Sequence, residues 1–261
     1  MSVPTRIRGR GAGFGAGLTV CLGLLAFGCQ REERTDLLVF AAASLTDVTE
    51  ALADSFSARF PDVQVRVSVA ATSILARQIR AGAEPAVFLA ASHDWMAWLD
   101  STGRLSEWRD VPFSTELVIV GRFNGVSIRD PHDLLHVDRV AVADPEHVPG
   151  GIYARHGLEC LGLWENLSSR LVPTLDVRAA LDALESGATD AAIVYAADVY
   201  RYADQFVAAR WPADCQPEIK YAIGIPKRPP IRDVARTFVD FAIGAAQEPV
   251  WANFGFSRRR P

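Results

Sequence analysis

Short apolar stretches that alternate with amphipathic stretches constrain the fold of this chain more than any other feature of its sequence. Residues 37–42 (Leu-Leu-Val-Phe-Ala-Ala) predict a buried strand, after which Val48, Leu52 and Phe56 recur every four residues, as on one face of a helix. Residues 63–69 alternate valine with polar residues and predict a second strand. Strands that alternate with helices predict parallel sheets covered by helices on both faces.

The same order continues along most of the chain. Further strands are predicted over residues 86–90, 116–120, 139–143 and 191–195, and further helices over residues 72–82, 95–99, 152–161, 177–184 and 232–254. Breaks near Pro112 and over residues 221–226 divide this series. We therefore expect two α/β lobes, the first made of residues 36–113 and 224–261 and the second of residues 114–223.

Composition and charge exclude some classes of partner. The chain has 261 residues, of which 49% are hydrophobic and 22% charged, and its formal net charge is −4. This balance is typical of a soluble globular chain, and no long run of lysine or arginine crosses its body, so a phosphate backbone is not an expected partner. The sequence predicts no nucleic-acid binding.

The first 28 residues have the layout of a secretory signal peptide. Arg6, Arg8 and Arg10 precede an uncharged apolar run that ends at Gly28, and a polar cluster follows. A single membrane anchor is the alternative, which the glycines of the run disfavour. Residues 25–29 (Leu-Ala-Phe-Gly-Cys) resemble the lipobox of bacterial lipoproteins, so we expect Cys29 to carry lipid, although Ala26 replaces the usual leucine. Ordinary cleavage with an unmodified Cys29 remains the alternative.

The cysteines and histidines indicate no metal site. Cys160 and Cys215 could pair in an oxidising compartment, but spacing alone leaves free thiols equally open. The sequence has no CxxC pair, and His132 and His136, four residues apart, suit a solvated helix face better than half a metal site. We therefore expect no metal cofactor.

Small polar residues and glycines follow several of the predicted strands. Ligands of open α/β sheets bind beyond the carboxyl ends of strands, where helix N-termini offer backbone N–H groups suited to a small anion. The candidates are Ser44, with Asp47 at capping-box spacing, then Thr72 and Ser73, the pair Gly150 and Gly151, Val177 and Tyr195. Each serine or threonine alone could be an ordinary helix cap, and Tyr195 could be a packed core residue.

Five segments together resemble the ModA family of molybdate-binding proteins of bacterial importers. They are residues 40–47 (Phe-Ala-Ala-Ala-Ser-Leu-Thr-Asp), 72–79, 144–154, 176–178 and 192–195. The resemblance covers residues 37–256 and implies a two-lobed periplasmic binding protein of type II, with parallel-rich sheets flanked by helices and a hinge of two crossovers. It also implies an oxyanion site formed by Ser44, Thr72, Gly150, Val177 through its N–H, and Tyr195. Thr72 and Gly150 depart from the serine and alanine usual in the family.

The implied function is that of the substrate-binding component of an ABC importer for molybdate or tungstate. Such a protein is expected to be a monomer in the periplasm or cell envelope, to deliver its anion to the permease, and to have neither cofactor nor enzymatic activity. Arg178, beside Val177, is expected to face the surface or an acidic neighbour, since neutral donors hold the anion. The alternatives are a binding protein for sulfate, phosphate or thiosulfate, or a serine hydrolase using Ser44, for which the sequence lacks a G-x-S-x-G motif.

Overall fold

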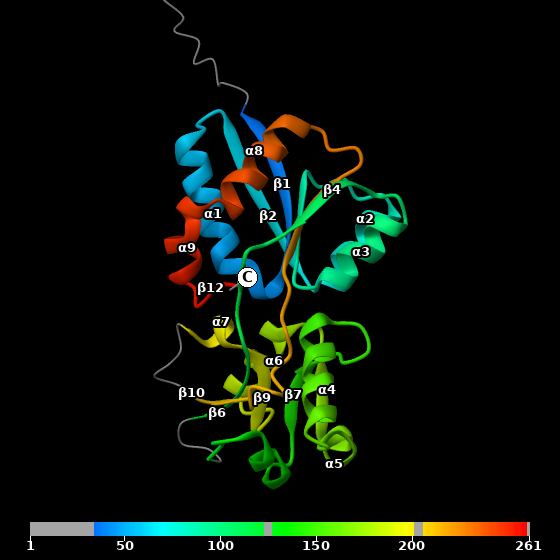
Figure 1. The fold of residues 1–261 in the computed structure, drawn as a ribbon, viewed down its shortest axis with the longest axis vertical. Helices are drawn as coiled ribbons and strands as arrows, with labels where there is room; N and C mark the ends of the chain where they lie inside the picture. Colours follow the sequence, from blue (N-terminus) through cyan, green and yellow to red (C-terminus); the bar gives the residue numbers. More distant parts are fainter. Residues whose placement is uncertain (1–33, 123–126, 201–205, 260–261) are drawn as a thin grey trace, which may run out of the picture. The chain divides into compact units, whose positions relative to one another are not determined.

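Two five-stranded sheets organise the protein, which the computed structural model describes over residues 34–122, 127–200 and 206–259. The strand order is β2-β1-β3-β11-β4 in the first sheet and β10-β6-β9-β7-β8 in the second. Figure 1 shows the first sheet with its helices in the upper half of the view and the second sheet with its helices in the lower half.

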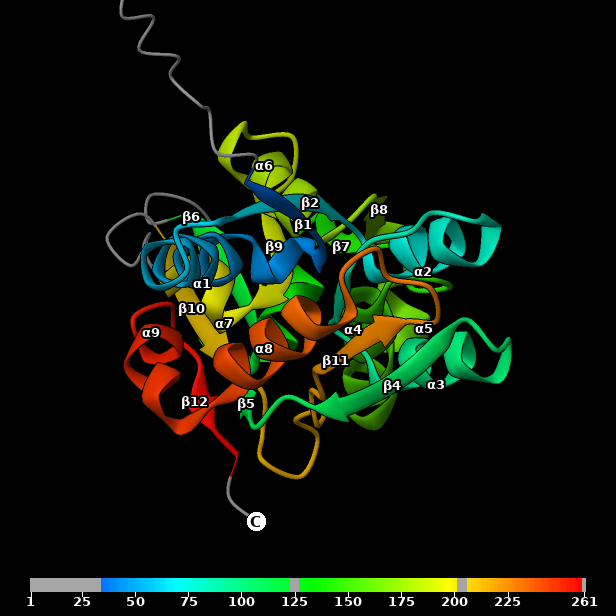
Figure 2. The same ribbon diagram turned by 90° about the horizontal axis from the view of Figure 1, so that it is seen from above.

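Helices cover both faces of the first sheet. Its strands are β1 (Thr35–Ala42), β2 (Val63–Ala70), β3 (Val87–Ala90), β4 (Leu105–Asp110) and β11 (Ala222–Pro226). Its helices are η1 (Ala43–Leu45), α1 (Thr46–Arg59), α2 (Thr72–Ala81), α3 (His93–Ser101), α8 (Arg232–Ile243), η5 (Ala245–Gln247) and α9 (Glu248–Ala252). Successive side chains of a strand point to opposite faces, so Val39 packs in one core with α1 and α8, and Phe40 in another with α2 and α3. Figure 2 shows these two pairs of helices on opposite sides.

The second sheet is covered in the same way. Its strands are β6 (Leu117–Arg122), β7 (Val140–Ala143), β8 (Leu171–Thr174), β9 (Ala191–Tyr195) and β10 (Phe206–Arg210). Its helices are η2 (Pro131–His136), α4 (Pro149–Cys160), α5 (Trp164–Leu167), η3 (Ser168–Arg170), α6 (Val177–Glu185) and α7 (Ala196–Val199). Leu181 and Leu184 of α6 pack with Val118 on one face, and Leu158 of α4 packs in the core on the other.

Each sheet is parallel except for one reversed strand. β1 pairs in parallel with β2 and β3, and β7 with β8 and β9, whereas β11 is antiparallel to β3 and β4, and β6 to β9 and β10. The parallel-rich sheets expected from the sequence are therefore confirmed, with these two strands as the antiparallel members. The reason is connectivity: β6 and β11 each follow a segment that passes between the sheets, without the helix that joins parallel strands.

Two features link distant parts of the chain. β5 (Phe113–Ser114), in the segment that leaves the first sheet, pairs antiparallel with β12 (Ser257–Arg258). Cys160 at the end of α4 forms a disulfide with Cys215, which resolves the alternative that the sequence left open.

Part of the sequence-based prediction lies outside the described residues, namely the signal peptide over residues 1–28 and lipidation of Cys29. Among the residues that the structure describes, no helix combines the length and apolar character needed to cross a membrane.

Candidate functional site

A small cavity lies where strand ends of the two sheets meet. Ser44, Thr72, Gly150, Val177 and Tyr195 all line it, so the structure brings the five residues expected from the sequence together. The remaining lining residues, which the sequence did not single out, are Ala42, Ala43, Ala71, Ala91, Val148, Pro149 and Asp176. Hydroxyls and helix N-termini therefore share an enclosure whose other walls are mostly small apolar side chains.

Ser44 does not cap a helix, contrary to the sequence-based prediction. It lies inside η1, and α1 begins only at Thr46, whose own hydroxyl donates to the Ala43 carbonyl at 2.7 Å. The capping box expected between Ser44 and Asp47 is absent, because the N-cap of α1 is Leu45 and makes no side-chain cap hydrogen bond. The Ser44 hydroxyl is buried and has no hydrogen-bond partner in the described part of the chain.

Thr72 is the first residue of α2 and is also not the N-cap, which is Ala71. Its buried Oγ1 accepts the N–H of Ala91, directly after β3, at 3.0 Å. A hydroxyl can accept and donate at the same time. The bond to Ala91 therefore fixes the Thr72 side chain and leaves its proton available.

Gly150 and Gly151 open α4 behind Pro149 and have different structural reasons to be glycine. A Cβ on Gly151 would overlap the backbone carbonyl of Ala143 at the end of β7. A Cβ on Gly150 would instead overlap the side chain of Val177 and lie 3.6 Å from the Tyr195 hydroxyl oxygen. Gly151 thus permits α4 to pack closely on the end of β7. A side chain at Gly150 would instead occupy space beside Val177 and Tyr195, which line the cavity.

Val177 is the first residue of α6, and its N-cap Asp176 explains how a carboxylate can line this cavity. Asp176 Oδ1 accepts the N–H of Ala179 at 2.9 Å, as an aspartate N-cap does. The first N–H groups of a helix have no acceptor within the helix. The N-terminal ends of α2, α4 and α6 therefore present backbone donors and partial positive charge to the cavity.

Tyr195 ends β9 with its side chain buried. Its hydroxyl has no hydrogen-bond partner among the described residues, and burial raises the pKa of Tyr195 well above its usual value. The phenol therefore stays protonated and can act as a donor. The ring of Tyr221, a residue that the sequence did not single out, meets the Tyr195 ring edge-on at 6.3 Å between centroids.

Arg178 faces acidic neighbours, as the sequence analysis expects. Its Nη2 lies 2.6 Å from Asp47 Oδ2 of α1, and its Nε lies 2.9 Å from Asp198 Oδ1 of α7. Asp198 is buried and also accepts the backbone N–H of Tyr195 at 3.2 Å. The guanidinium next to the cavity-lining residue Val177 in sequence is therefore balanced by two carboxylates.

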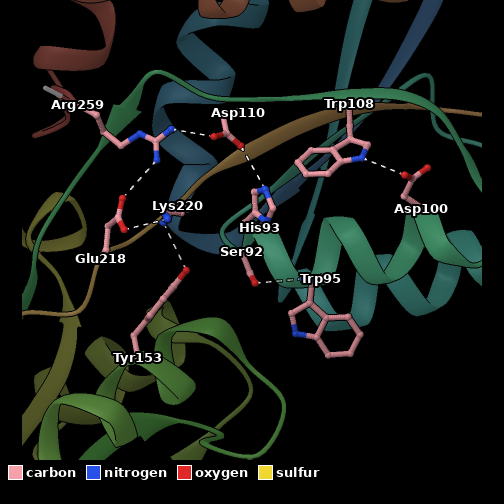
Figure 3. A network of polar contacts seen from close by, with 10 residues as sticks. All are labelled: Ser92, His93, Trp95, Asp100, Trp108, Asp110, Tyr153, Glu218, Lys220 and Arg259. Carbon is pink, nitrogen blue, oxygen red and sulfur yellow. Dashed lines mark hydrogen bonds and ion pairs between the residues drawn. The ribbon is translucent and has the colours of Figure 1, made fainter. Parts of the chain in front are cut away.

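Two connecting segments pass between the sheets: residues 111–116 lie between β4 and β6, and residues 211–221 lie between β10 and β11. A polar network lies around them (Figure 3). Arg259 lies 3.2 Å from Asp110 and 3.9 Å from Glu218, which in turn pairs with Lys220 at 2.9 Å. The hydroxyl of Tyr153, from α4, accepts the backbone N–H of Lys220 at 3.4 Å. Polar contacts thus link the ends of the connecting segments to Arg259 near the C-terminus and to Tyr153 of α4.

Larger hollows exist elsewhere on the protein, but none of the buried, unpaired polar side chains of the described residues lines them. One of about 680 Å³ is lined by the connecting segments and the last strand, and another of about 410 Å³ by Trp95, Trp98 and α4. Over the described residues, no group of three or more histidine, cysteine or acidic side chains is placed to hold a metal ion.

The lining residues that the sequence missed include alanines at the ends of strands. Ala42 is the last residue of β1 and Ala43 follows it, Ala71 follows β2, and Ala91 follows β3. Their recurrence at successive strand ends is a signal that the sequence contains. Alanine is also common in helices and cores, so this recurrence alone does not indicate a binding site.

Comparisons with known proteins extend over nearly all of the described chain. Residues 37–257 match the family described as bacterial extracellular solute-binding protein. The molybdate-binding protein ModA of Escherichia coli K12 is 34% identical over 229 residues, which cover 85% of this chain and 88% of that protein. The Haemophilus influenzae protein of the same name is 32% identical over 228 residues, with 85% and 89% covered.

Solved structures share the fold at lower sequence identity. The periplasmic molybdate-binding protein of Azotobacter vinelandii superposes with a TM-score of 0.77 at 22% identity, covering 86% of this chain and all (100%) of that one. The sulfate-binding protein SubI of Mycobacterium tuberculosis superposes with a TM-score of 0.76 at 19% identity, with 87% and 88% covered. Both likenesses concern the two-lobed α/β architecture. The sequence matches establish that this chain belongs to the bacterial extracellular solute-binding proteins and, within them, to the ModA family.

Proposed function

We propose that this protein is the substrate-binding component of an ABC importer for molybdate or tungstate. The observation that carries the proposal is the pair of buried hydroxyls, on Ser44 and Tyr195, that line one cavity without a hydrogen-bond partner in the described structure. An unpaired buried donor is costly, by about 1 to 3 kcal/mol, unless a ligand satisfies it.

The chemistry of the donors favours a fully ionised oxyanion. A tetrahedral dianion has only acceptors, so a site for it needs hydroxyl and N–H donors and no free carboxylate. Ser44, Thr72 and Tyr195 supply hydroxyls, and Gly150 and Val177 supply N–H groups at helix N-termini. Because Asp47 and Asp198 balance Arg178, the site binds through neutral donors rather than through a dedicated cation.

The relatives named molybdate-binding support this particular oxyanion among those that the same donors would suit. Molybdate and tungstate are similar in size, and sulfate is smaller. A ring of donors spaced for the larger anion leaves sulfate short of hydrogen bonds. Sulfate, phosphate and thiosulfate are the alternative ligands, and the likeness to the sulfate-binding protein SubI makes sulfate the first of them to test.

The rest of the proposal concerns the setting of this site. The protein delivers its anion to the transmembrane permease, works as a monomer in the periplasm or cell envelope, and loses residues 1–28 on export, with lipid on Cys29. Two lobes, residues 36–113 with 224–261 and residues 114–223, close over the anion. The separate sheets and the two connecting segments between them support these bounds.

We propose no catalytic activity and no cofactor. A serine hydrolase needs a general base within reach of its nucleophile, and the residues that line the cavity beside Ser44 include no histidine. Esterase activity that depended on Ser44 would contradict the proposal.

Calorimetric titration of the purified protein with molybdate, tungstate, sulfate and phosphate tests the proposal. We expect tight binding of molybdate and tungstate and much weaker binding of the other two. Ser44→Ala should weaken molybdate binding by about 1.5 to 3 kcal/mol, roughly tenfold to a hundredfold, as for a hydrogen bond to a charged group. Ser101→Ala removes an exposed hydroxyl outside the cavity and is the matched control. Preference for sulfate or phosphate would overturn the proposal.

A further inference from the structure

An ion pair joins the two proposed lobes beside the anion cavity. Arg178 Nη2, from α6 of the second lobe, lies 2.6 Å from Asp47 Oδ2, from α1 of the first. The two side chains have 26% and 32% of their surface exposed, so water screens this pair less than a pair on the open surface. A movement that separated the lobes would break it.

Each member of the pair is close in sequence to a residue that lines the cavity. Arg178 directly follows Val177, and Asp47 comes three residues after Ser44. Each is also the second residue of its helix, and α6 packs against η1, the turn that contains Ser44. The ion pair therefore sets the spacing between a backbone donor of one lobe and a hydroxyl of the other.

A second carboxylate keeps Arg178 attached to its own lobe. Its Nε lies 2.9 Å from Oδ1 of Asp198, whose side chain has 0% of its surface exposed. The other oxygen of Asp198 accepts the backbone N–H of Tyr195 at 3.2 Å, within the same lobe. A buried carboxylate is costly without a positive partner, so the contact between Arg178 and Asp198 persists when the lobes separate.

The guanidinium group is suited to bridging two carboxylates. It carries five N–H donors in one plane, so different nitrogens can face different partners. In Arg178 the Nε faces Asp198 and the Nη2 faces Asp47. Because Asp198 fixes the guanidinium, little side-chain freedom is lost when Asp47 approaches it.

We propose that Arg178 is a latch of the closed form, a side chain that stays paired with Asp198 of its own lobe and pairs with Asp47 only when the lobes have closed over the anion. This inference rests on the proposed function, since closure is closure over that ligand. Arg178 is a positioning residue: it does not touch the anion and acts on the spacing of Ser44 and Val177. A positive charge thus adds to affinity while the neutral donors select the anion.

Asp47→Asn tests the latch, because it removes the charge of the first lobe and leaves the pair of Arg178 with Asp198 intact. We expect calorimetry to show molybdate binding weakened about threefold to twentyfold. The Tm of the ligand-free protein should stay at the wild-type value, and the rise in Tm on adding molybdate should be smaller. An ion pair that only stabilises the fold would lower both Tm values equally.

Asp240→Asn is the matched control. It makes the same chemical change in an ion pair of the same length, since Asp240 Oδ1 of α8 lies 2.6 Å from Arg109 Nη2 of β4. Both of these residues belong to the first lobe, so closure does not alter their distance. We expect Asp240→Asn to leave molybdate affinity within about twofold of wild type.

A double-mutant cycle shows whether Asp47 acts through Arg178. In an Arg178→Gln background, Asp47→Asn should change molybdate affinity less than about twofold, because the partner charge is gone. Arg178→Gln also removes the positive partner of buried Asp198, so it should lower the Tm with and without molybdate. If Arg178→Gln does not fold, the affinity and Tm values of Asp47→Asn and Asp240→Asn still decide the question.

The outcomes separate the two proposals. If the unsubstituted protein binds none of the oxyanions, the proposed function and this inference both fall. If it binds molybdate and Asp47→Asn binds it equally well, or if Asp47→Asn lowers the Tm equally with and without molybdate, only the latch is overturned.

Discussion

Gly150 and Val177 share one small volume at the edge of the cavity. A methyl group on Gly150 overlaps the Val177 side chain, which is β-branched and has few rotamers to move to at the start of α6. We expect Gly150→Ala to lower the free energy of unfolding by about 1 to 3 kcal/mol, the usual effect of overpacking, and to weaken anion binding. Denaturant unfolding and calorimetry measure the two effects.

The pair offers its own control. In Gly150→Ala/Val177→Ala the overlapping methyl groups of valine are absent, so stability should recover most of what Gly150→Ala loses. A double variant that is no more stable than Gly150→Ala would show that the overlap with Val177 is not the cause.

Asp198 predicts a specific dependence of stability on pH. Burial raises its pKa to about 6 from 3.8, although Arg178 and the Tyr195 N–H lower it. The folded state therefore holds this proton more tightly than the unfolded state does. The resulting stabilisation is fully present below pH 3.8 and is lost as pH rises through about 6, on the order of 3 kcal/mol at most.

Asp198→Asn keeps the shape of the side chain and removes its titration. We expect it to flatten the change in unfolding free energy between pH 4 and about 6.5, measured from urea midpoints. Asp54→Asn, an exposed site on α1, is the control and should retain the wild-type profile. A wild-type profile in Asp198→Asn would contradict the assignment.

For individual residues, the sequence predicts which side chains line the cavity better than it predicts the structural role of each one. The sequence predicts a helix cap at Ser44 because a serine between a strand and an amphipathic run fits a cap pattern, whether or not a short 3₁₀ turn intervenes. The sequence does not predict that Tyr221 is buried beside Tyr195, because a single tyrosine in a loop carries no local pattern that indicates burial. Its burial depends on Phe256 and Tyr195, which lie far from it in sequence.

Three of the strands that the sequence missed, β4, β8 and β11, have residues that break the usual strand pattern. β11 contains Gly224 and ends at Pro226, and β8 contains Pro173, so both read as turns or loops. β4 is mostly exposed at the edge of the first sheet and therefore carries polar residues. The buried parallel strands, in contrast, were predictable because both of their faces are apolar.

The disulfide ties α4 to the segment that precedes Tyr221. Its two cysteines are separated by 55 residues, and closing a loop of that size in the unfolded chain gives about 2 to 4 kcal/mol of stability. We expect Cys160→Ala/Cys215→Ala to lower the unfolding free energy by that amount in urea titrations. A reducing agent should destabilise the wild type and leave the variant unchanged, and equal stability of the two oxidised proteins would contradict this expectation.

For the molecule as a whole, contacts between the proposed lobes favour a closed form with the anion bound. Trp95 Nε1 donates to the His147 carbonyl at 3.0 Å, and Arg178 pairs with Asp47 at 2.6 Å, each joining a residue of one lobe to the other. Donors from both lobes satisfy the anion only when they are close together.

Small-angle scattering tests this closure. We expect the radius of gyration to fall when molybdate is added to the ligand-free protein and to stay unchanged with chloride at the same ionic strength. Identical profiles with and without molybdate would contradict closure.

The position of β11 also has a consequence for the order in which the protein folds. Strands β6 to β10 are contiguous in sequence, whereas β3 finds its neighbour β11 only after the chain has passed through the whole of the second sheet. Pairings between residues far apart in sequence form slowly, because a long loop must close first. Until β11 arrives, β3 is an uncovered edge that can pair with another chain. A chain of this topology therefore exposes an unpaired strand edge during folding in the first sheet, whose strands β1 and β2 lead to Ser44 and Thr72.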